Sequence, residues 1–370
     1  MSSSASRSSN GRVVWSSSTR SRARRPRTRC NVDYSSNTWQ VDDLRSLFRE
    51  GTRMSKPLAI GSVSMRLYPH DLPAQGQIDE ARVQARLAVE AGFDGVMVAE
   101  HHCGFPGYFP NPHQIGGFLL PAMPHGWIAS APMLLPMLPY TMFAEFLAWL
   151  NAAYPGRVGG GFGSGAFPDD FAIVNVPFEE IGARFREALP KVVAALRGED
   201  PTPAGGDRAL QACKENPIPV VAAAQSLPAV RRAAGLGIGI LYDSLQTNDH
   251  SVKLSTAYDE AGGTAAKILI RRVWIGDPPA ENAEAQMAAF RAVGSERVAK
   301  NWGDDDQLIH GPDGVETAEK LAEVVRASNV NAVNIRIHLK GLEPAQVRGQ
   351  IERFGNEFLP HFRKIWKVGA

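Results

Sequence analysis

Residues 95–102 read Gly-Val-Met-Val-Ala-Glu-His-His, an apolar run that ends in three ionisable side chains. The run is continuous rather than alternating, which is typical of a parallel strand covered on both faces. Before it, Val83, Leu87 and Ala91 share one face of a helical pattern that Gly92 stops. The segment is therefore one helix–strand unit of an α/β fold, with polar groups at the carboxyl end of the strand, where barrels place catalytic side chains.

The same alternation continues along the chain. Eight apolar, β-rich runs are predicted to be strands: Leu58–Met65, Gly95–Ala99, Trp127–Ala131, Val158–Phe162, Pro219–Ala224, Ile238–Tyr242, Lys267–Ile275 and Ala332–Ile337. Helical stripes separate them, and Pro190 in one stripe predicts a kink or a break. The pattern predicts an α/β fold, a (β/α)8 TIM barrel with insertions after the second and seventh strands. A doubly wound sheet is the alternative, because periodicity does not prove closure.

One uncharged stretch imitates a membrane segment. Residues 119–144 contain no Asp, Glu, Lys or Arg, and that length alone suggests a span. Five prolines interrupt it, which no single helix tolerates. We interpret it as the third strand and the entry to the next helix, and we expect no membrane partner.

The first 53 residues differ from the rest in charge. They hold 11 Arg, no Lys and four acidic residues, a net charge of +7, whereas the remaining residues carry −5. Residues 1–30 contain ten Ser, eight Arg and few apolar side chains, so we expect a disordered basic extension. A transit peptide and a nucleic-acid tail are alternatives, although no nucleic-acid partner is expected. We favour Met54 as the true start, with residues 54–370 forming the barrel.

Cysteine and histidine usage argues against a metal site. Cys30, Cys103 and Cys213 share no ligand spacing, and a sparse, odd count fits a reducing compartment, so the cytoplasm is the expected location. His101 and His102 are neighbours on a strand end and point to opposite sides, so they do not easily bind one ion. We expect no metal.

Two predicted insertions, 103–118 and 277–310, follow strands and would form the active face of a barrel. Four aromatic residues in them are candidates for an apolar substrate pocket: Phe105, Tyr108, Phe109 and Trp302. The alternative is that these rings only pack.

Two segments at strand ends suit a phosphate group. Residues 159–165 read Gly-Gly-Gly-Phe-Gly-Ser-Gly, and glycines there allow close backbone approach to a cofactor, although a crowded barrel turn would also need them. A dinucleotide-binding motif requires a helix directly after the glycines, and none is predicted here. Ser226 precedes a helix after the fifth strand, where a serine is a good N-cap and the helix N-terminus favours phosphate.

Together these segments resemble the bacterial luciferase-like family of flavin-dependent monooxygenases. The matching segments are 91–95 and 98–102 with Asn111-Pro112, Ala144-Glu145, 155–158 with 161–165, 219–226 with 232–234 and Gly237, and 358–363. The resemblance extends in order over 58–364. It implies a barrel that binds reduced flavin, or in some branches a deazaflavin, at the carboxyl face of its strands.

The resemblance also implies roles for single residues. His101 matches the catalytic histidine near the reactive flavin edge, and Ser226 matches a phosphate-binding serine. The phosphate loop is matched by Gly163, Ser164 and Gly165. Luciferases proper have an arginine at the position of Ser164 and an acidic residue at that of Gln225. Loss of the arginine removes a bidentate phosphate partner, which weakens FMN binding or favours another cofactor.

The third strand carries a further expected element of the flavin site. Members of this family have a cis peptide there that bulges against the flavin ring, and the matching bond is Ala131-Pro132. Proline lowers the cost of a cis bond, and it removes an N–H that regular pairing would use. The alternative is a trans proline that ends the strand.

We therefore expect a luciferase-like flavin-dependent monooxygenase that uses reduced FMN and O2 to oxygenate a small organic substrate. A separate flavin reductase would supply the reduced FMN. The oligomeric state that we consider is a homodimer. One alternative is a deazaflavin (coenzyme F-420)-dependent oxidoreductase on the same barrel, and another is a flavin-binding barrel without catalysis. Fold-level analogy does not identify the substrate.

Overall fold

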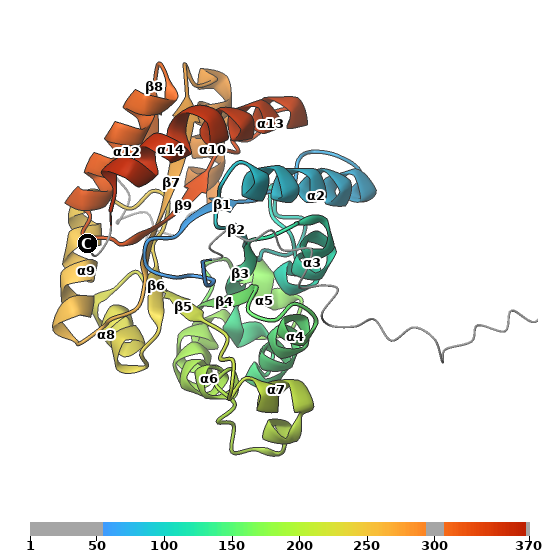
Figure 1. The fold of residues 1–370 in the computed structure, drawn as a ribbon. Coiled ribbons are helices and arrows are strands. Elements are labelled where there is room, and N and C mark those ends of the chain that lie inside the picture. Colours follow the sequence, from blue (N-terminus) through green and yellow to red (C-terminus); the bar gives the residue numbers. More distant parts are fainter. Residues whose placement is uncertain (1–54, 294–306, 368–370) are drawn as a thin grey trace, which may run out of the picture. The chain divides into compact units, whose positions relative to one another are not determined.

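The structure is a computed structural model that describes residues 55–293 and 307–367 (Figure 1). The chain divides into two units, 1–52 and 53–370, and the second contains every described element. The basic extension expected at 1–53, Met54 and Trp302 lie outside the described residues.

Parallel strands of the second unit form a closed barrel. The strands are β1 (Val63–Arg66), β2 (Gly95–Val98), β3 (Trp127–Leu134), β4 (Val158–Gly163), β5 (Val220–Ala223), β6 (Gly239–Leu241), β7 (Lys267–Ile275), β8 (Leu308–Gly311) and β9 (Ala332–Arg336). Eight of them close in the order β1-β2-β3-β4-β5-β6-β7-β9, with β9 pairing back to β1. The eight predicted strands correspond to these eight, so the barrel is confirmed and the doubly wound alternative is wrong.

Strand β8 is an addition that the sequence did not indicate. It pairs with the segment Arg272–Ile275, the carboxyl half of the long strand β7, and takes no part in the closure. It follows helix α10 in the segment 277–310, which was predicted only as an insertion. This insertion therefore contains a helix and a strand that extend the sheet beyond the barrel.

Helices cover the outside of the strands (Figure 1). They are α2 (Ala74–Glu90), α3 (Pro112–Leu119), α4 (Tyr140–Ala153), α5 (Pro168–Ala172), α6 (Ile181–Ala195), α7 (Arg208–Ala212), α8 (Leu227–Gly235), α9 (Asn248–Glu260), α10 (Ala280–Val293), α12 (Gly314–Ala327), α13 (Pro344–Arg353) and α14 (Leu359–Ile365). Helix α6 continues through Pro190 instead of ending there. Its buried stripe, including Leu189 and Val192, packs in the main core on both sides of the proline, and this packing offsets the lost hydrogen bond.

Side chains, not solvent, fill the barrel. Leu58 and Trp127 lie at its amino end, and Met97, Val221 and Leu241 fill the middle, all nearly inaccessible. On β4, a Cβ at Gly161 would lie 2.5 Å from the Cβ of Ala131, so β3 and β4 approach too closely there for any other residue. The packed interior leaves the carboxyl ends of the strands as the place for a site.

The uncharged stretch 119–144 forms the end of α3, strand β3 and the start of α4, as interpreted from its prolines. Within it, the Ala131-Pro132 peptide bond is cis, as expected. The β3–β4 register shifts between Ser130 and Met133, which is the bulge that the proline predicted. Among the described helices, none combines the length and the apolar character needed to cross a bilayer.

Candidate functional site at the carboxyl end of the barrel

His101 lies just beyond β2 and is held by a carboxylate from another part of the chain. Its Nδ1 lies 2.8 Å from Oδ2 of Asp170, which is 2% exposed. The other oxygen of Asp170 accepts the backbone N–H of His102 at 2.7 Å. Asp170 stands in the first turn of α5, two positions after the proline at the first helical position, where an acidic residue is favoured. One carboxylate therefore fixes both the imidazole and the chain that carries it.

This contact assigns the two ring nitrogens of His101. Because a carboxylate only accepts hydrogen bonds when ionised, Nδ1 carries a proton toward Asp170. Nε2 makes no hydrogen bond with any residue that the structure describes, and the side chain is 16% exposed. Nε2 is thus the nitrogen available to exchange a proton with a ligand.

Aromatic rings surround the imidazole. The ring of Phe105 stacks on His101 with centroids 4.7 Å apart, Tyr108 meets it edge-on at 4.5 Å, and Phe167 lies at 5.1 Å. Phe109 is 4% exposed and belongs to the main core, where its carbonyl accepts the backbone N–H of His101. Of the pocket aromatics proposed from the sequence, Phe105 and Tyr108 border the histidine and Phe109 packs beneath the loop.

The second histidine has a different partner. Nε2 of His102 lies 3.2 Å from Oε1 of Glu100, and the other oxygen of Glu100 accepts the backbone N–H of Leu134. The backbone N–H of Glu100 donates to the carbonyl of Pro132. Glu100 thus ties the end of β2 to the bulge of β3. Over 55–293 and 307–367, no group of three or more His, Cys, Asp or Glu side chains is arranged to hold a metal ion.

Small residues on β3, β4 and β5 lie beside this cluster. A Cβ added at Gly163 would lie 3.4 Å from Cβ of Pro132 and 3.6 Å from Cβ of Ala223, which are ordinary contacts. Protein packing therefore does not require glycine at 163. Gly165 is different, since its φ is +84° and a Cβ would lie 2.3 Å from the ring of Phe171.

The groups predicted to hold phosphate lie at the ends of β4 and β5. Ser226 is the N-cap of α8, yet its hydroxyl makes no capping hydrogen bond and the residue is exposed. Within the described part of the chain, Oε1 of Gln225 is buried without a hydrogen-bond partner. The hydroxyl of Ser164 lies 3.5 Å from the carbonyl oxygen of Gly165. An uncommitted hydroxyl beside the first N–H groups of a helix suits a phosphate.

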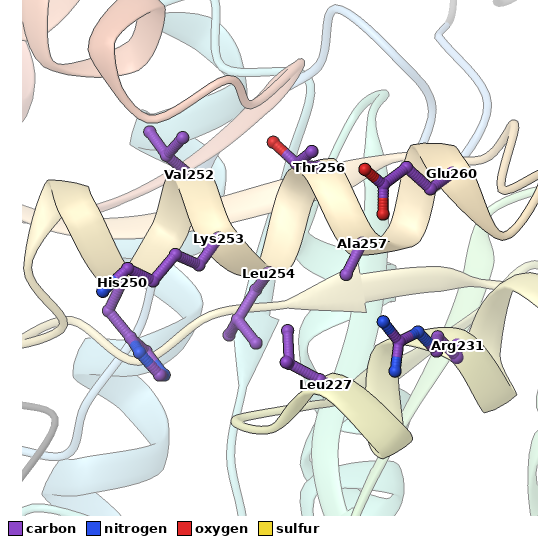
Figure 2. Close-up of a pocket in the computed structure, with 9 residues that line it drawn as sticks. All are labelled: Leu227, Arg231, His250, Val252, Lys253, Leu254, Thr256, Ala257 and Glu260. Atoms are coloured by element: carbon purple, nitrogen blue, oxygen red, sulfur yellow. The ribbon is translucent and has the colours of Figure 1, made fainter.

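A shallow groove lies elsewhere, outside the barrel (Figure 2). It runs between α8 and α9, where Leu254 and Ala257 point toward Leu227 and Arg231. Its lining includes none of the residues around His101. The closest link is His250, whose Nε2 lies 3.4 Å from the carbonyl oxygen of Gln225. The groove is a surface feature of the helical layer rather than the mouth of the barrel.

Asp170 is the functional residue that the sequence analysis missed. Its only local signal is the run Pro168-Asp169-Asp170 after the glycine-rich segment, which also describes an ordinary helix start. The partner His101 lies 69 positions earlier. Only the closed barrel brings the loop after β4 onto the end of β2.

Comparison with known proteins supports the fold and identifies a family. The family model described as luciferase-like monooxygenase matches residues 58–356. No curated protein matches the chain in sequence. Similar solved structures include the monooxygenase RslO1 from Streptomyces bottropensis, with a TM-score of 0.70 and 17% identity over 81% of this chain and 99% of that one.

Two further structures represent different cofactors. One is the oxygenating constituent of 3,6-diketocamphane monooxygenase from Pseudomonas putida in complex with FMN, with a TM-score of 0.66 and 17% identity over 82% of this chain and 98% of that one. The other is the coenzyme F-420-dependent tetrahydromethanopterin reductase from Methanopyrus kandleri, with a TM-score of 0.59 and 18% identity over 82% of this chain and 100% of that one. At these identities the structures show a shared fold, and the family match covers most of the sequence. The chain therefore belongs to the luciferase-like monooxygenase family.

Proposed function

We propose that this protein is a flavin-dependent monooxygenase that uses reduced FMN and O2 to oxygenate a small organic substrate. The observation that carries the proposal is His101, which Asp170 holds at Nδ1 and whose Nε2 has no hydrogen-bond partner among the described residues, close to the bulge of β3 between Ser130 and Met133. Family membership supports redox chemistry at this end of the barrel.

The residues that would hold the cofactor come from three neighbouring strands. Ala131, Pro132 and Gly163 would lie against the ring system. Its phosphate end would be bound by Ser164, Gly165, Gln225 and Ser226. When bound, the flavin would supply electron transfer and oxygen activation, which no protein side chain provides.

The chain itself would handle the proton and exclude water. Asp170 keeps the proton of His101 on Nδ1, so Nε2 would accept a proton from the reacting group or return one to it. Phe105, Tyr108 and Phe167 pack around the imidazole and would keep bulk water from this nitrogen. Trp302 stays a proposed pocket residue outside the described segments.

The second candidate is a deazaflavin-dependent oxidoreductase that uses coenzyme F-420. Ser164 favours it, because a serine offers the FMN phosphate a weaker contact than the arginine of luciferases proper. Among the structural neighbours, one is described in complex with FMN and another as coenzyme F-420-dependent. A third candidate is a barrel that binds flavin and catalyses nothing.

The proposed partners follow from the monooxygenase reaction. Reduced FMN would come from a separate flavin reductase, and the protein would work in the cytoplasm, as a homodimer, without nucleic acid or membrane. Residues 54–370 would be the functional chain, with Met54 as its start.

The experiment that decides among these candidates is anaerobic titration of the protein with reduced FMN and, separately, reduced coenzyme F-420, followed by mixing with O2. The proposal predicts micromolar or tighter binding of reduced FMN and a rate of reoxidation that differs from that of free FMN. Selective binding of the deazaflavin would favour the second candidate. FMN binding with reoxidation kinetics identical to those of free FMN would favour the third.

A further inference from the structure

Two buried arginines lie side by side on the wall of the barrel mouth formed by β1 and β9. The register of these strands pairs Ser64 with Asn334, and Arg66 and Arg336 each follow two positions later. Strand residues two apart share a face, and Ser64 and Asn334 hydrogen-bond to each other inside the barrel. The side chains of Arg66 and Arg336 are only 3% and 2% exposed. Two guanidinium groups are thus buried together at the carboxyl end of the barrel.

Neither arginine has a carboxylate partner within 55–293 and 307–367. Nε of Arg66 donates to Oδ1 of Asn334 at 2.8 Å, but its Nη2 is buried with no hydrogen-bond partner. Nε of Arg336 donates to the carbonyl of His338 at 3.1 Å, and its guanidinium lies 3.8 Å from the ring centre of Tyr68. Stacking on an aromatic ring stabilises a cation, yet most of the donors of both groups remain unused.

Arg157 shows how this chain treats a buried arginine that has only a structural role. It is 9% exposed, and its guanidinium donates to the carbonyl oxygens of Met123, His125 and Gly126 at 2.6–3.0 Å. Such saturation is the rule for buried donors. Arg66 departs from it, and an unpaired buried charge costs stability. A ligand that completes the donors of Arg66 explains the departure.

Among the described residues, the imidazoles near the two arginines do not neutralise their charges. Burial, Arg336 and His70 lower the pKa of His338 well below its usual value, so this imidazole is neutral at pH 7. Nδ1 of His70 lies 2.9 Å from the carbonyl oxygen of Leu342. Arg272 of β7 lies in register with Arg336 and is also buried. Because Arg272 has contacts of its own, the inference rests on Arg66 and Arg336 alone.

Aromatic rings connect this pair with His101. Tyr68, under Arg336, meets Tyr108 edge-on with centroids 5.2 Å apart, and Tyr108 lies 4.5 Å from the ring centre of His101. Burial, with Tyr68 nearby, raises the pKa of Tyr108 against the opposing effect of the arginines, so it stays a neutral hydroxyl. In the strand order, β1 and β9 stand across the barrel from β4 and β5. The cationic pair is therefore separate from the glycine-rich segment proposed to hold phosphate.

We propose that Arg66 and Arg336 bind the carboxylate of an organic acid substrate. The planar fork of a guanidinium matches a carboxylate in two hydrogen bonds, and a flat apolar body would lie along Tyr68 and Tyr108. This places the far end of the substrate toward His101. The substrate class rests on the proposed function, whereas the binding of the acid does not.

The test compares acids with their uncharged amides of the same shape. The probes are benzoate against benzamide and cinnamate against cinnamamide, titrated into the full-length protein in the absence of flavin, with calorimetric detection. The expected result is that at least one acid binds at least tenfold more tightly than its amide. Equal affinity of acid and amide in both pairs would overturn the proposal without any variant being made.

The variants assign the preference to the two arginines. Arg66→Gln and Arg336→Gln should each weaken binding of the preferred acid at least tenfold and leave binding of its amide within twofold. Arg184→Gln is the matched control, because Arg184 is exposed and paired with Glu180 on the outside of the barrel. It removes the same charge and should change neither affinity. An acid preference that survives both barrel variants overturns the assignment.

Two further measurements separate the outcomes. Arg66→Met should keep or raise the thermal midpoint, because it removes an unpartnered buried cation, and this variant serves if the glutamine variants misfold. Reduced FMN should bind both glutamine variants as it binds the wild type. Loss of FMN binding with an intact acid preference would assign the arginines to the cofactor instead. Since the acid titrations contain no flavin, failure of the proposed redox function would leave their result unchanged.

Discussion

The contact between His101 and Asp170 makes the first residue-scale prediction. If Nε2 of His101 handles a proton in the chemical step, His101→Ala should lower single-turnover rates by roughly 10²–10⁴-fold and leave the dissociation constant of reduced FMN nearly unchanged. Asp170→Asn keeps the shape but not the charge, so it should lower the rate less than His101→Ala. His361→Ala is the control, since Nε2 of His361 lies 3.2 Å from Oε1 of Glu319 on the outside of the barrel. A fully active His101→Ala variant would show that His101 does not transfer a proton in the chemical step.

Gly163 and Gly165 form a second matched pair at this scale. Because a Cβ at 163 meets only ordinary contacts, Gly163→Ala should leave the thermal midpoint unchanged while weakening FMN binding at least tenfold. Gly165→Ala should lower the midpoint, because a side chain at φ +84° is strained and would overlap Phe171. Thermal unfolding and flavin titration of both variants check this. Unchanged flavin affinity in Gly163→Ala would show that the ring lies elsewhere.

Helix α8 makes the prediction at the scale of elements. Since the hydroxyl of Ser226 makes no capping bond, Ser226→Ala should leave unfolding unaffected and weaken FMN binding by about 1–3 kcal/mol, the value of a hydrogen bond to a charged group. Helix α12 has a true side-chain cap, because the carboxylate of Asp313 accepts hydrogen bonds from the backbone N–H groups of Val315 and Glu316. Asp313→Ala should cost about 1 kcal/mol of stability and no flavin affinity. A drop in midpoint for Ser226→Ala at constant affinity would make Ser226 a cap only.

Elements also show where local pattern succeeds and where it fails. The strand positions were predictable, because continuous apolar runs between helical stripes are a local property of the chain. Strand β8 was not, since 308–311 becomes a strand by pairing with the carboxyl half of β7, which is distant in the sequence. The break expected at Pro190 is absent from α6 because burial of its apolar stripe outweighs one missing hydrogen bond.

At the scale of the whole molecule, the amino end of the barrel sets a boundary for the folded unit. Leu58 is buried inside the barrel, and the hydroxyl of Ser55 accepts a hydrogen bond from the indole of Trp127. A chain that starts at Met54 should therefore unfold at the same temperature as the full-length chain. Leu58→Ala in the same background should cost about 2–5 kcal/mol, because it opens a cavity in the barrel interior. Calorimetry of the full-length chain, the chain from Met54 and its Leu58→Ala variant checks this. A lower thermal midpoint for the chain from Met54 than for the full-length chain would show that residues 1–53 stabilise the barrel.

The sequence by itself determined the eight barrel strands with helices between them, and it placed His101 just after the second strand. These follow from hydrophobic periodicity and from residues close together in the chain, which are local properties of the sequence. Tertiary structure alone decided that Asp170 holds His101 and that Arg66 lies next to Arg336, 270 positions away. Such pairs depend on closure and register of the barrel, which depend on packing of the whole sheet rather than on any one segment.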